Sequence, residues 1–299
     1  MSETLTWDSE TTAAVERLAK ASVDDYYNPY QAFDWPAEIP SDAMWMSPQL
    51  LTVHGTDAAA ELSQQQLRDL SRWESIHFYS LNVHGIRELL TEVIRRIHTP
   101  GFEVPTPFFH HFVGEENEHM WFFAEFCLRY GKLYPDRSMP FPDQEQSQTL
   151  ANFLVFSRVL IFEQIVDYFN STMAADKSLP DTIRAINRIH HQDESRHIAF
   201  GCQLVRGLFD NLRKQADSRG DYAEIDFAQE YVDRYIATSL AQLYSVDVYR
   251  DAGIAEPHKF RARLVADPAR RREHDRVTAR TRSFYQRIGL FESTPTAAR

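Results

Sequence analysis

Apolar residues along most of this chain recur every three or four positions, which is the repeat of an amphipathic α-helix. The pattern is clearest at Leu62, Leu67, Leu70, Trp73, Phe78 and Leu81, and it continues through Ile86 to Ile94. No strand-like alternation extends over a useful length, and no unit repeats at an interval of 20–50 residues. The sequence therefore predicts an all-α protein.

Proline, glycine and helix-capping residues divide this pattern into separate helices. Residues 28–49 hold four prolines and no helical repeat, so we expect an ordered loop that wraps around the molecule. Long helices with short breaks between them favour a helical bundle. The expected helices cover residues 9–25, 58 to the Pro100–Gly101 pair, 106–130, 146–173, 180–215 and 222–250, with two shorter ones after residue 257.

The composition agrees with a helical protein in a reducing compartment. There are only 10 glycines, few for a sheet-rich fold, and 20 Phe and 13 Tyr to fill an interior. Cys127 and Cys202 are too few for a disulfide framework, so we expect a cytoplasmic location. The N-terminus lacks a signal-peptide pattern, and we identify no stretch of about 18 apolar residues that would span a bilayer. No membrane partner is expected.

The net charge of −11 disfavours a nucleic-acid partner, because phosphate contacts need a basic surface. No phosphate-binding glycine loop, dinucleotide fingerprint, flavin motif or iron–sulfur motif is present. We interpret the C-terminal arginine cluster as a solvated helix face paired with acids. It consists of Arg261, Arg263, Arg270, Arg271, Arg272, Arg276, Arg280 and Arg282.

Four of the predicted helices each carry a glutamate where an apolar residue is expected. These are Glu74, Glu116, Glu163 and Glu194. A carboxylate on the buried face of a helix is costly unless it is paired or coordinates a metal. Four such residues on four helices favour a shared metal site over isolated buried acids.

Two of these glutamates begin the same motif, because Glu116 and His119 repeat the spacing of Glu194 and His197. The spacing places a carboxylate and an imidazole one helical turn apart. Two such pairs, with a lone Glu from each of two other helices, form the ligand set of ferritin-like di-iron and di-manganese proteins. Chance alone gives about one Glu-x-x-His in such a chain, and Glu74 begins a third copy. The order Glu, Glu-x-x-His, Glu, Glu-x-x-His along the chain is therefore stronger evidence for a metal site than the Glu-x-x-His motif alone.

A further histidine extends the second pair. His190 lies one turn before Glu194, so His190, Glu194 and His197 line one helix face, a pattern expected only about 0.04 times by chance. His191 points roughly 100° away from this face, and Glu118 also points elsewhere, so neither is an expected ligand. Oxygen and nitrogen donors without a thiolate suit iron or manganese better than zinc.

This constellation resembles the p-aminobenzoate N-oxygenase family of di-iron enzymes, over about residues 61–205. The resemblance implies one domain with a ferritin-like four-helix core and additional terminal helices. Its parts would be an N-terminal wrap at 1–56, metal-binding helices at 57–216 and C-terminal helices at 217–299. It also implies the metal ligands Glu74, Glu116, His119, Glu163, His190, Glu194 and His197, with no catalytic residue beyond them.

The same resemblance implies the activity. The family includes the arylamine oxygenases of aureothin and chloramphenicol biosynthesis, in which a reduced di-iron centre uses dioxygen to oxidise an amine nitrogen. The products are hydroxylamine, nitroso or nitro compounds. By resemblance we expect two iron ions (or manganese), dioxygen as co-substrate and an amine substrate, with aryl amines first. We also expect an external electron donor or reductase and a homodimer.

Other functions fit the same residues. A di-iron oxygenase on this scaffold could instead hydroxylate, desaturate or cleave a substrate at carbon. An iron-storage protein would take up many irons per chain, whereas an oxygenase takes two. A helical interaction module would leave the buried acids unexplained. Aromatic residues near the glutamates, namely Trp73, Phe112, Phe162 and Phe200, fit either a pocket for a planar ring or an ordinary core.

Overall fold

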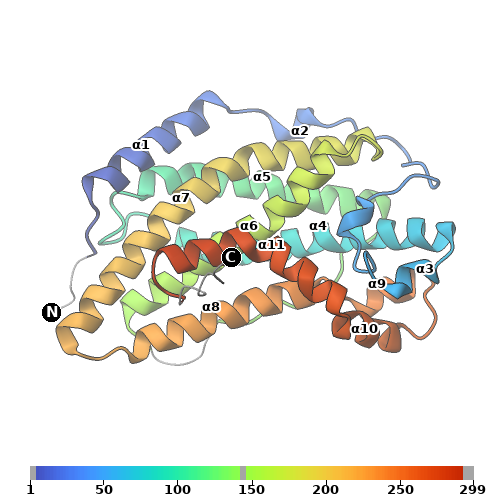
Figure 1. Ribbon diagram of the computed structural model, residues 1–299. Helices are drawn as coiled ribbons and strands as arrows, with labels where there is room; N and C mark the ends of the chain where they lie inside the picture. Colours follow the sequence, from blue (N-terminus) through green and yellow to red (C-terminus); the bar gives the residue numbers. More distant parts are fainter. Residues whose placement is uncertain (1–4, 142–145, 292–299) are drawn as a thin grey trace, which may run out of the picture.

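A computed structural model describes residues 5–141 and 146–291. Within these ranges the secondary structure is helical, and no strand occurs. Four long helices lie side by side in a bundle in which α4 pairs with α5 and α6 pairs with α7 (Figure 1). The all-α prediction is therefore confirmed. The four are α4 (Gln64–Ile94), α5 (Thr106–Tyr130), α6 (Gln148–Ala175) and α7 (Asp181–Arg219).

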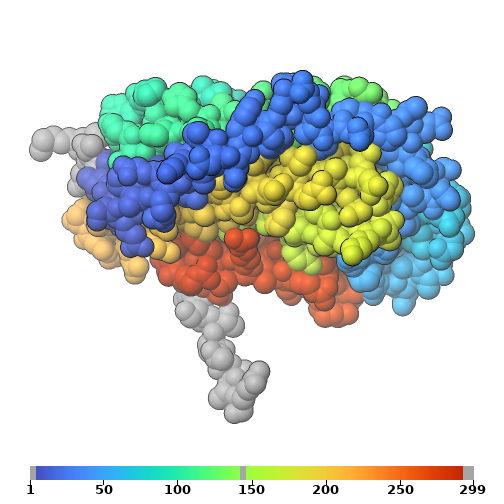
Figure 2. Space-filling model, turned by 90° about the horizontal axis from the view of Figure 1, so that it is seen from above, coloured from blue at the N-terminus to red at the C-terminus, as the bar shows by residue number. Residues whose placement is uncertain are grey.

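Further helices at both ends of the chain cover this bundle. Helix α1 (Ser9–Asp24) runs over α5 and α7, as the view from above shows (Figure 2). Helix α8 (Ala223–Gln242) packs on α6 and α7, and α9 (Val246–Asp251) packs on α4. Helix α10 (Pro257–Ala266) follows, and α11 (Pro268–Arg287) packs on α6.

The segment over residues 28–49 lies against the bundle. It contains two short helical pieces, α2 (Pro29–Ala32) and the 3₁₀-helix η1 (Pro48–Leu50), and is otherwise irregular. The backbone N–H of Trp45 donates to Ser71 Oγ on α4 at 3.1 Å. The hydroxyl of Tyr130 on α5 donates to the carbonyl of Pro36 at 2.7 Å. These bonds fix the loop against two helices of the bundle.

The prediction of one helix from residue 58 to Pro100 is wrong at its start. The short helix α3 (Asp57–Ala60) ends first, and α4 begins only at Gln64. Ser63 starts the new helix because its side chain accepts a bond from the Gln66 backbone while the Gln66 side chain bonds the Ser63 backbone. This reciprocal capping box satisfies N–H groups that a continuous helix would have bonded internally.

The predicted helix over residues 222–250 is also divided, because α8 ends at Gln242 and α9 begins at Val246. Tyr244 lies in the break, where it is buried and its carbonyl accepts a bond from Arg261 at 2.8 Å. Its hydroxyl contacts Arg270 and His274. These long-range bonds hold Tyr244 outside a helical path, which local propensity does not reveal.

Helix α6 passes through the centre of the molecule. By length and composition alone it could cross a membrane, since its most apolar window has a mean hydropathy of 1.5. The expectation that no such stretch exists is therefore corrected. In the fold, 83% of that window is buried inside the protein, which is the pattern of a bundle's core helix.

Candidate metal centre

Six of the seven predicted ligands come together inside the bundle. Each is buried, with at most 2% of its surface exposed. Helix α5 supplies two of them, α6 one and α7 three, each from a helix face that also carries apolar residues. The six are Glu116, His119, Glu163, His190, Glu194 and His197.

The two Glu-x-x-His pairs form the centre of this cluster. One ligand atom from each of Glu116, His119, Glu194 and His197 lies within 4.8 Å of the others. Glu116 Oε1 is 3.0 Å from His119 Nδ1 and 2.9 Å from His197 Nδ1. His190 extends the group, with Nε2 at 3.0 Å from Glu194 Oε1. The spacing within each helix therefore produced the predicted juxtaposition.

Many of the oxygen and nitrogen atoms that could bind a metal in this cluster have no hydrogen-bond partner within the described chain. Such atoms are Glu116 Oε2, both oxygens of Glu163 and Glu194, His190 Nε2 and His197 Nδ1. Leaving buried polar atoms unpaired is costly, and native structures rarely do so without a reason. Carboxylate oxygens and imidazole nitrogens that converge in this way fit a pair of iron or manganese ions.

Each imidazole is held at its outward nitrogen by a polar side chain. His119 Nε2 contacts Asp193 Oδ2 at 2.9 Å, and His197 Nε2 contacts Glu115 Oε2 at 2.7 Å. His190 Nδ1 contacts the side-chain amide of Asn170. Such contacts fix the orientation of each ring and leave its inward nitrogen available to a metal.

Sequence reasoning missed these supporting residues. Glu115 and Asp193 each directly precede the glutamate of a Glu-x-x-His pair, so a repeated acidic doublet was the available signal. Arg196 joins the two acids, with bonds of 2.5 Å to Asp193 and 3.2 Å to Glu115. It also reaches Asp25 at 2.9 Å, just beyond α1. Asn170 had no signal in the sequence.

The electrostatics also show that the carboxylates are crowded. Burial and the nearby carboxylates of Glu194 and Glu116 raise the pKa of Glu163 well above its usual range. Burial would raise the pKa of Glu194 too, but His190 and His197 lower it well below its usual range. Although burial lowers the pKa of His119, Glu116 and Asp193 raise it to about 10. Positive charge is therefore favoured at the centre of the cluster.

The structure does not bring Glu74 to this cluster. Its carboxylate accepts bonds from the backbone N–H of Thr52 at 3.0 Å and from the Thr52 hydroxyl. Helix α4 instead passes Glu163 with its Phe78–Gly85 stretch, since Phe78 stacks on Phe169 and Gly85 faces Phe162. Glu74 lies about two turns before the middle of that stretch, too far along α4 to reach the other six.

Two other residues have the places that the helical repeat predicts. The side chain of His191 is 44% exposed and contacts Asp167, away from the cluster. Glu118 is only partly buried, whereas the six clustered residues are fully buried, and it is not one of the converging side chains. Neither belongs to the group of converging donors.

One cavity touches the cluster, and a second is lined by residues that neighbour Glu163 along α6. The first, a narrow apolar cavity of about 10 Å³, touches His197 and is lined by Phe112, Val159 and Phe200 among others. The second, which we call the apolar chamber, lies between α4, α6 and α8 and includes Phe78, Asn82, Phe162 and Val166. Phe162 and Val166 flank Glu163 on α6. Phe112, Phe162 and Phe200 therefore line cavities as well as packing in the core.

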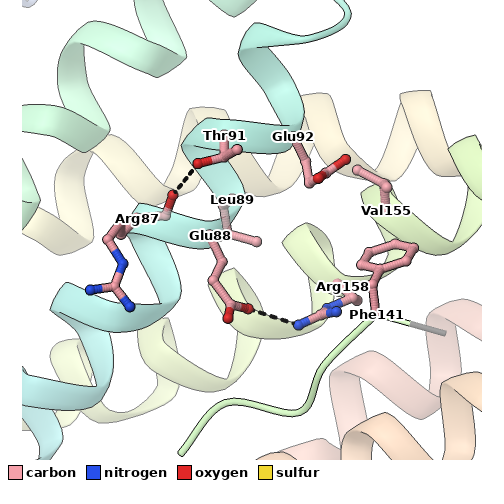
Figure 3. Close-up of a pocket in the computed structure, with 8 residues that line it drawn as sticks. All are labelled: Arg87, Glu88, Leu89, Thr91, Glu92, Phe141, Val155 and Arg158. Carbon is pink, nitrogen blue, oxygen red and sulfur yellow. Dashed lines mark hydrogen bonds and ion pairs between the residues drawn. The ribbon is translucent and has the colours of Figure 1, made fainter. Parts of the chain in front are cut away.

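An outer pocket adjoins the apolar chamber, because Glu88, Leu89 and Arg158 line both. In Figure 3, Glu88 of α4 points toward Arg158 of α6, and the two side chains form a 2.9 Å ion pair. The Arg158 guanidinium also lies over the rings of Phe141 and Tyr235, each at 4.9 Å. Both members of this ion pair therefore line the chamber and the outer pocket.

Comparison with known proteins places the chain in a family. A family model described as p-aminobenzoate N-oxygenase AurF matches residues 8–289. Two mutants of an R2-like ligand-binding oxidase, solved with an aerobically reconstituted Mn/Fe cofactor, are similar in structure. One has 14% identity and a TM-score of 0.49, covering 97% of this chain and 96% of that chain. The other has 13% identity and a TM-score of 0.45, covering 91% and 95%. No curated protein matches the chain.

The match to the family model spans both Glu-x-x-His pairs, the intervening Glu163 and the extra His190. It also spans the helices before and after the bundle, beyond residues 61–205 where the motifs lie. A ferritin-like bundle with a buried cluster of carboxylates and imidazoles agrees with it. The chain therefore belongs to the p-aminobenzoate N-oxygenase family and is a di-iron oxygenase.

Proposed function

We propose that this protein is a dioxygen-dependent N-oxygenase that oxidises an amine, with aryl amines as the first class, to hydroxylamine, nitroso or nitro products. We further propose that the six clustered residues are the ligands of its two metal ions. The observation that carries the proposal is the cluster of buried carboxylate oxygens and imidazole nitrogens that have no hydrogen-bond partner. The chain's membership of the family supports the same conclusion. A reductase or other electron donor, a homodimer and a cytoplasmic location remain predictions.

The six clustered residues would hold the metal pair, which when bound would supply electrons to dioxygen and open positions for it. The protein's own residues orient the site. Asp193, Glu115 and Asn170 hold the outward nitrogens of the three imidazoles, so each ring presents its other nitrogen to the centre. Arg196 balances the charge of Asp193 and Glu115 and ties them to each other.

The surroundings of the cluster exclude water. Phe108 lies 6.3 Å and Phe112 4.7 Å from the His197 ring, measured between ring centroids, and Phe108 stacks on Phe200. The narrow cavity against His197 has about the room of one water-sized molecule. Its lining is apolar, which favours dioxygen over water.

Among the polar residues that line the apolar chamber, Asn82 has a free acceptor that suits an amine. Asn82 is fully buried, and its Nδ2 donates to the Phe78 carbonyl at 2.8 Å. Its Oδ1 is buried without a hydrogen-bond partner. An amine N–H is the donor that this oxygen lacks, while Phe78 and Phe162 provide faces for a planar ring.

The first test is the metal content of protein expressed with iron, followed by addition of dioxygen to the reduced protein. We expect about two irons per chain and a visible absorption change whose decay aryl amines accelerate, with N-oxygenated products by mass spectrometry. Products oxidised at carbon would replace our proposal by a carbon oxygenase. Many irons per chain, or no reaction with dioxygen, would argue for storage or binding.

A pair of variants tests the proposed ligand set. Glu163→Gln should lower the iron content below two per chain, because it removes a buried donor of the cluster. Glu74→Gln is the matched control, since Glu74 is an equally buried glutamate on a neighbouring helix whose partner is Thr52. Loss of iron in Glu74→Gln would restore Glu74 to the ligand set and contradict our assignment.

A further variant tests the amine contact. Asn82→Leu keeps the size of the side chain but removes its acceptor oxygen. We expect two irons per chain and a normal reaction with dioxygen, but an acceleration by aryl amines at least tenfold weaker, about the worth of one buried hydrogen bond. Unchanged acceleration would show that the amine does not bind Asn82.

A further inference from the structure

A further cavity, of about 360 Å³, shares lining residues with the apolar chamber but none with the outer pocket. Helix α4, the 135–137 segment, the end of α8 and helix α10 all contribute to its wall. We call it the basic cavity. Its polar lining consists chiefly of His77, Arg137, Tyr244, Ser245, His258 and Arg261.

The basic cavity differs in charge from the rest of the molecule. The chain carries a net charge of −11, yet none of the residues that line this cavity is an aspartate or glutamate. Arg137 is paired at 2.6 Å with Asp247, which lies outside the lining. Arg261 Nε donates to the Tyr244 carbonyl, and its terminal amino groups have no hydrogen-bond or ion-pair partner within the described chain. Arg137 is therefore compensated by Asp247, and Arg261 supplies the uncompensated positive charge of the cavity.

His77 gives a second, independent indication of a ligand. Only 6% of its surface is exposed, its ring lines the cavity, and no group of the described chain is within hydrogen-bonding geometry of it. Tyr134 meets the ring edge-on at 5.3 Å, so it provides packing only. Burial and the nearby Arg137 lower the pKa of His77 to about 4, which keeps the ring neutral with one N–H to donate. A buried imidazole of this kind is stabilised by a bound acceptor.

The basic cavity adjoins the apolar chamber, because Leu81 and Gln242 line both. Leu81 lies one turn beyond His77 on α4. A single small molecule can therefore place a charged group near His77 and Arg261 while its apolar part occupies the chamber.

We propose that the basic cavity binds an oxyanion, a phosphate or carboxylate group of a small molecule, through Arg261, Arg137 and the N–H of His77. The anion is one end of the enzyme's substrate, and the other end lies in the apolar chamber. This last step rests on the proposed function, whereas anion binding itself does not.

The test measures binding of inorganic phosphate and of benzoate to the iron-loaded protein by isothermal titration calorimetry. We expect saturable binding at one site per chain. The anion that binds more tightly identifies the charged group of the natural ligand. Tighter binding of phosphate indicates a phosphate monoester, and tighter binding of benzoate indicates a carboxylic acid. Absence of saturable binding for both would overturn the proposal.

Two matched arginine variants locate the site. Arg261→Met should weaken anion binding at least tenfold, because it removes a charge from the cavity wall. Arg263→Met removes a charge from the same helix, but Arg263 pairs with Glu61 outside the cavity, so binding should stay within twofold of the wild type. Equal effects of the two variants would show only general electrostatic attraction and overturn the site.

A third variant and a kinetic readout complete the test. His77→Phe keeps an aromatic ring against Tyr134 but has no N–H, so it should weaken binding of the preferred anion several-fold. That anion should raise the KM of the amine without changing kcat. If anion binding fails while two irons and the reaction with dioxygen remain, this inference is wrong and the proposed function stands.

Discussion

At the scale of single residues, the metal centre depends on which atom each side chain leaves free. His119, His190 and His197 each use one ring nitrogen to contact a supporting side chain, and each turns the other toward the carboxylates. Three buried carboxylates, those of Glu116, Glu163 and Glu194, cannot all be ionised together without compensating cations. The cluster is therefore built around positive charge that the bound metal supplies.

Glu74 gives a pH prediction because its carboxylate is buried away from the cluster. Burial raises the pKa of Glu74 from 4.5 to about 7, although bonds from Thr52 oppose the shift. The unfolded chain ionises first, so the folded state loses stability as pH rises from about 4.5 to about 7. Relative to Glu74→Gln, the wild-type free energy of unfolding should fall by roughly 3 kcal/mol across this window.

Urea unfolding of both proteins at several pH values checks this prediction. Other titrating groups cancel in the difference between the two proteins, so only Glu74 contributes. A difference that stays constant from about pH 4.5 to about pH 7.5 would contradict the raised pKa.

Arg196 gives a second prediction at this scale. Arg196→Met leaves the carboxylates of Asp193 and Glu115 buried without their cation, which should cost about 3–5 kcal/mol of stability. Asp25→Asn removes only the exposed end of the same network and should cost less than about 1 kcal/mol. Thermal unfolding of the two variants provides the measurement, and similar losses for both would refute the argument.

At the scale of elements, the apolar chamber depends on how closely α4 approaches α6. Gly85 permits this approach, since an added Cβ would lie 2.3 Å from the Phe162 ring. The contact sets the position of Phe162, which lines the chamber next to Glu163. The packing of two helices thus shapes the space beside the metal centre.

Two glycine variants test this contact. Gly85→Ala should push Phe162 into the chamber, lower stability by roughly 1–2 kcal/mol and raise the KM of a bulky amine. Gly114→Ala in α5 meets nothing within 4 Å, so it should stabilise the protein by about 0.5–1 kcal/mol through helix propensity. Thermal unfolding and steady-state kinetics report both effects, and a stabilised Gly85→Ala would show that the ring moves at no cost.

At the scale of the whole molecule, we expect the metal ions to help hold the bundle together. Helices α5, α6 and α7 meet at the cluster, and each brings at least one buried carboxylate to it. Without metal, these like charges repel in a region of low dielectric. The bundle and its cofactor are therefore linked thermodynamically.

Metal removal measures this linkage. Dialysis against a chelator should lower the Tm by roughly 5–10 °C, and added Fe(II) should restore it, because a ligand that binds only the folded state stabilises it. The Glu163→Gln variant should show a smaller difference between its metal-loaded and metal-free forms. A Tm unaffected by chelation would separate stability from metal binding.

The sequence by itself determined the long helices and the six clustered donors, because both depend on spacings of three or four residues within one helix. His190, Glu194 and His197 share a face whatever the rest of the chain does. Only the tertiary structure decided that Glu74 lies outside the cluster, since the sequence does not show which turn of α4 lies opposite Glu163. Long-range contacts also fixed the break at Tyr244 and the pairing of Asn170 with His190. Local periodicity specifies which side of a helix a residue occupies, whereas packing decides what that side meets.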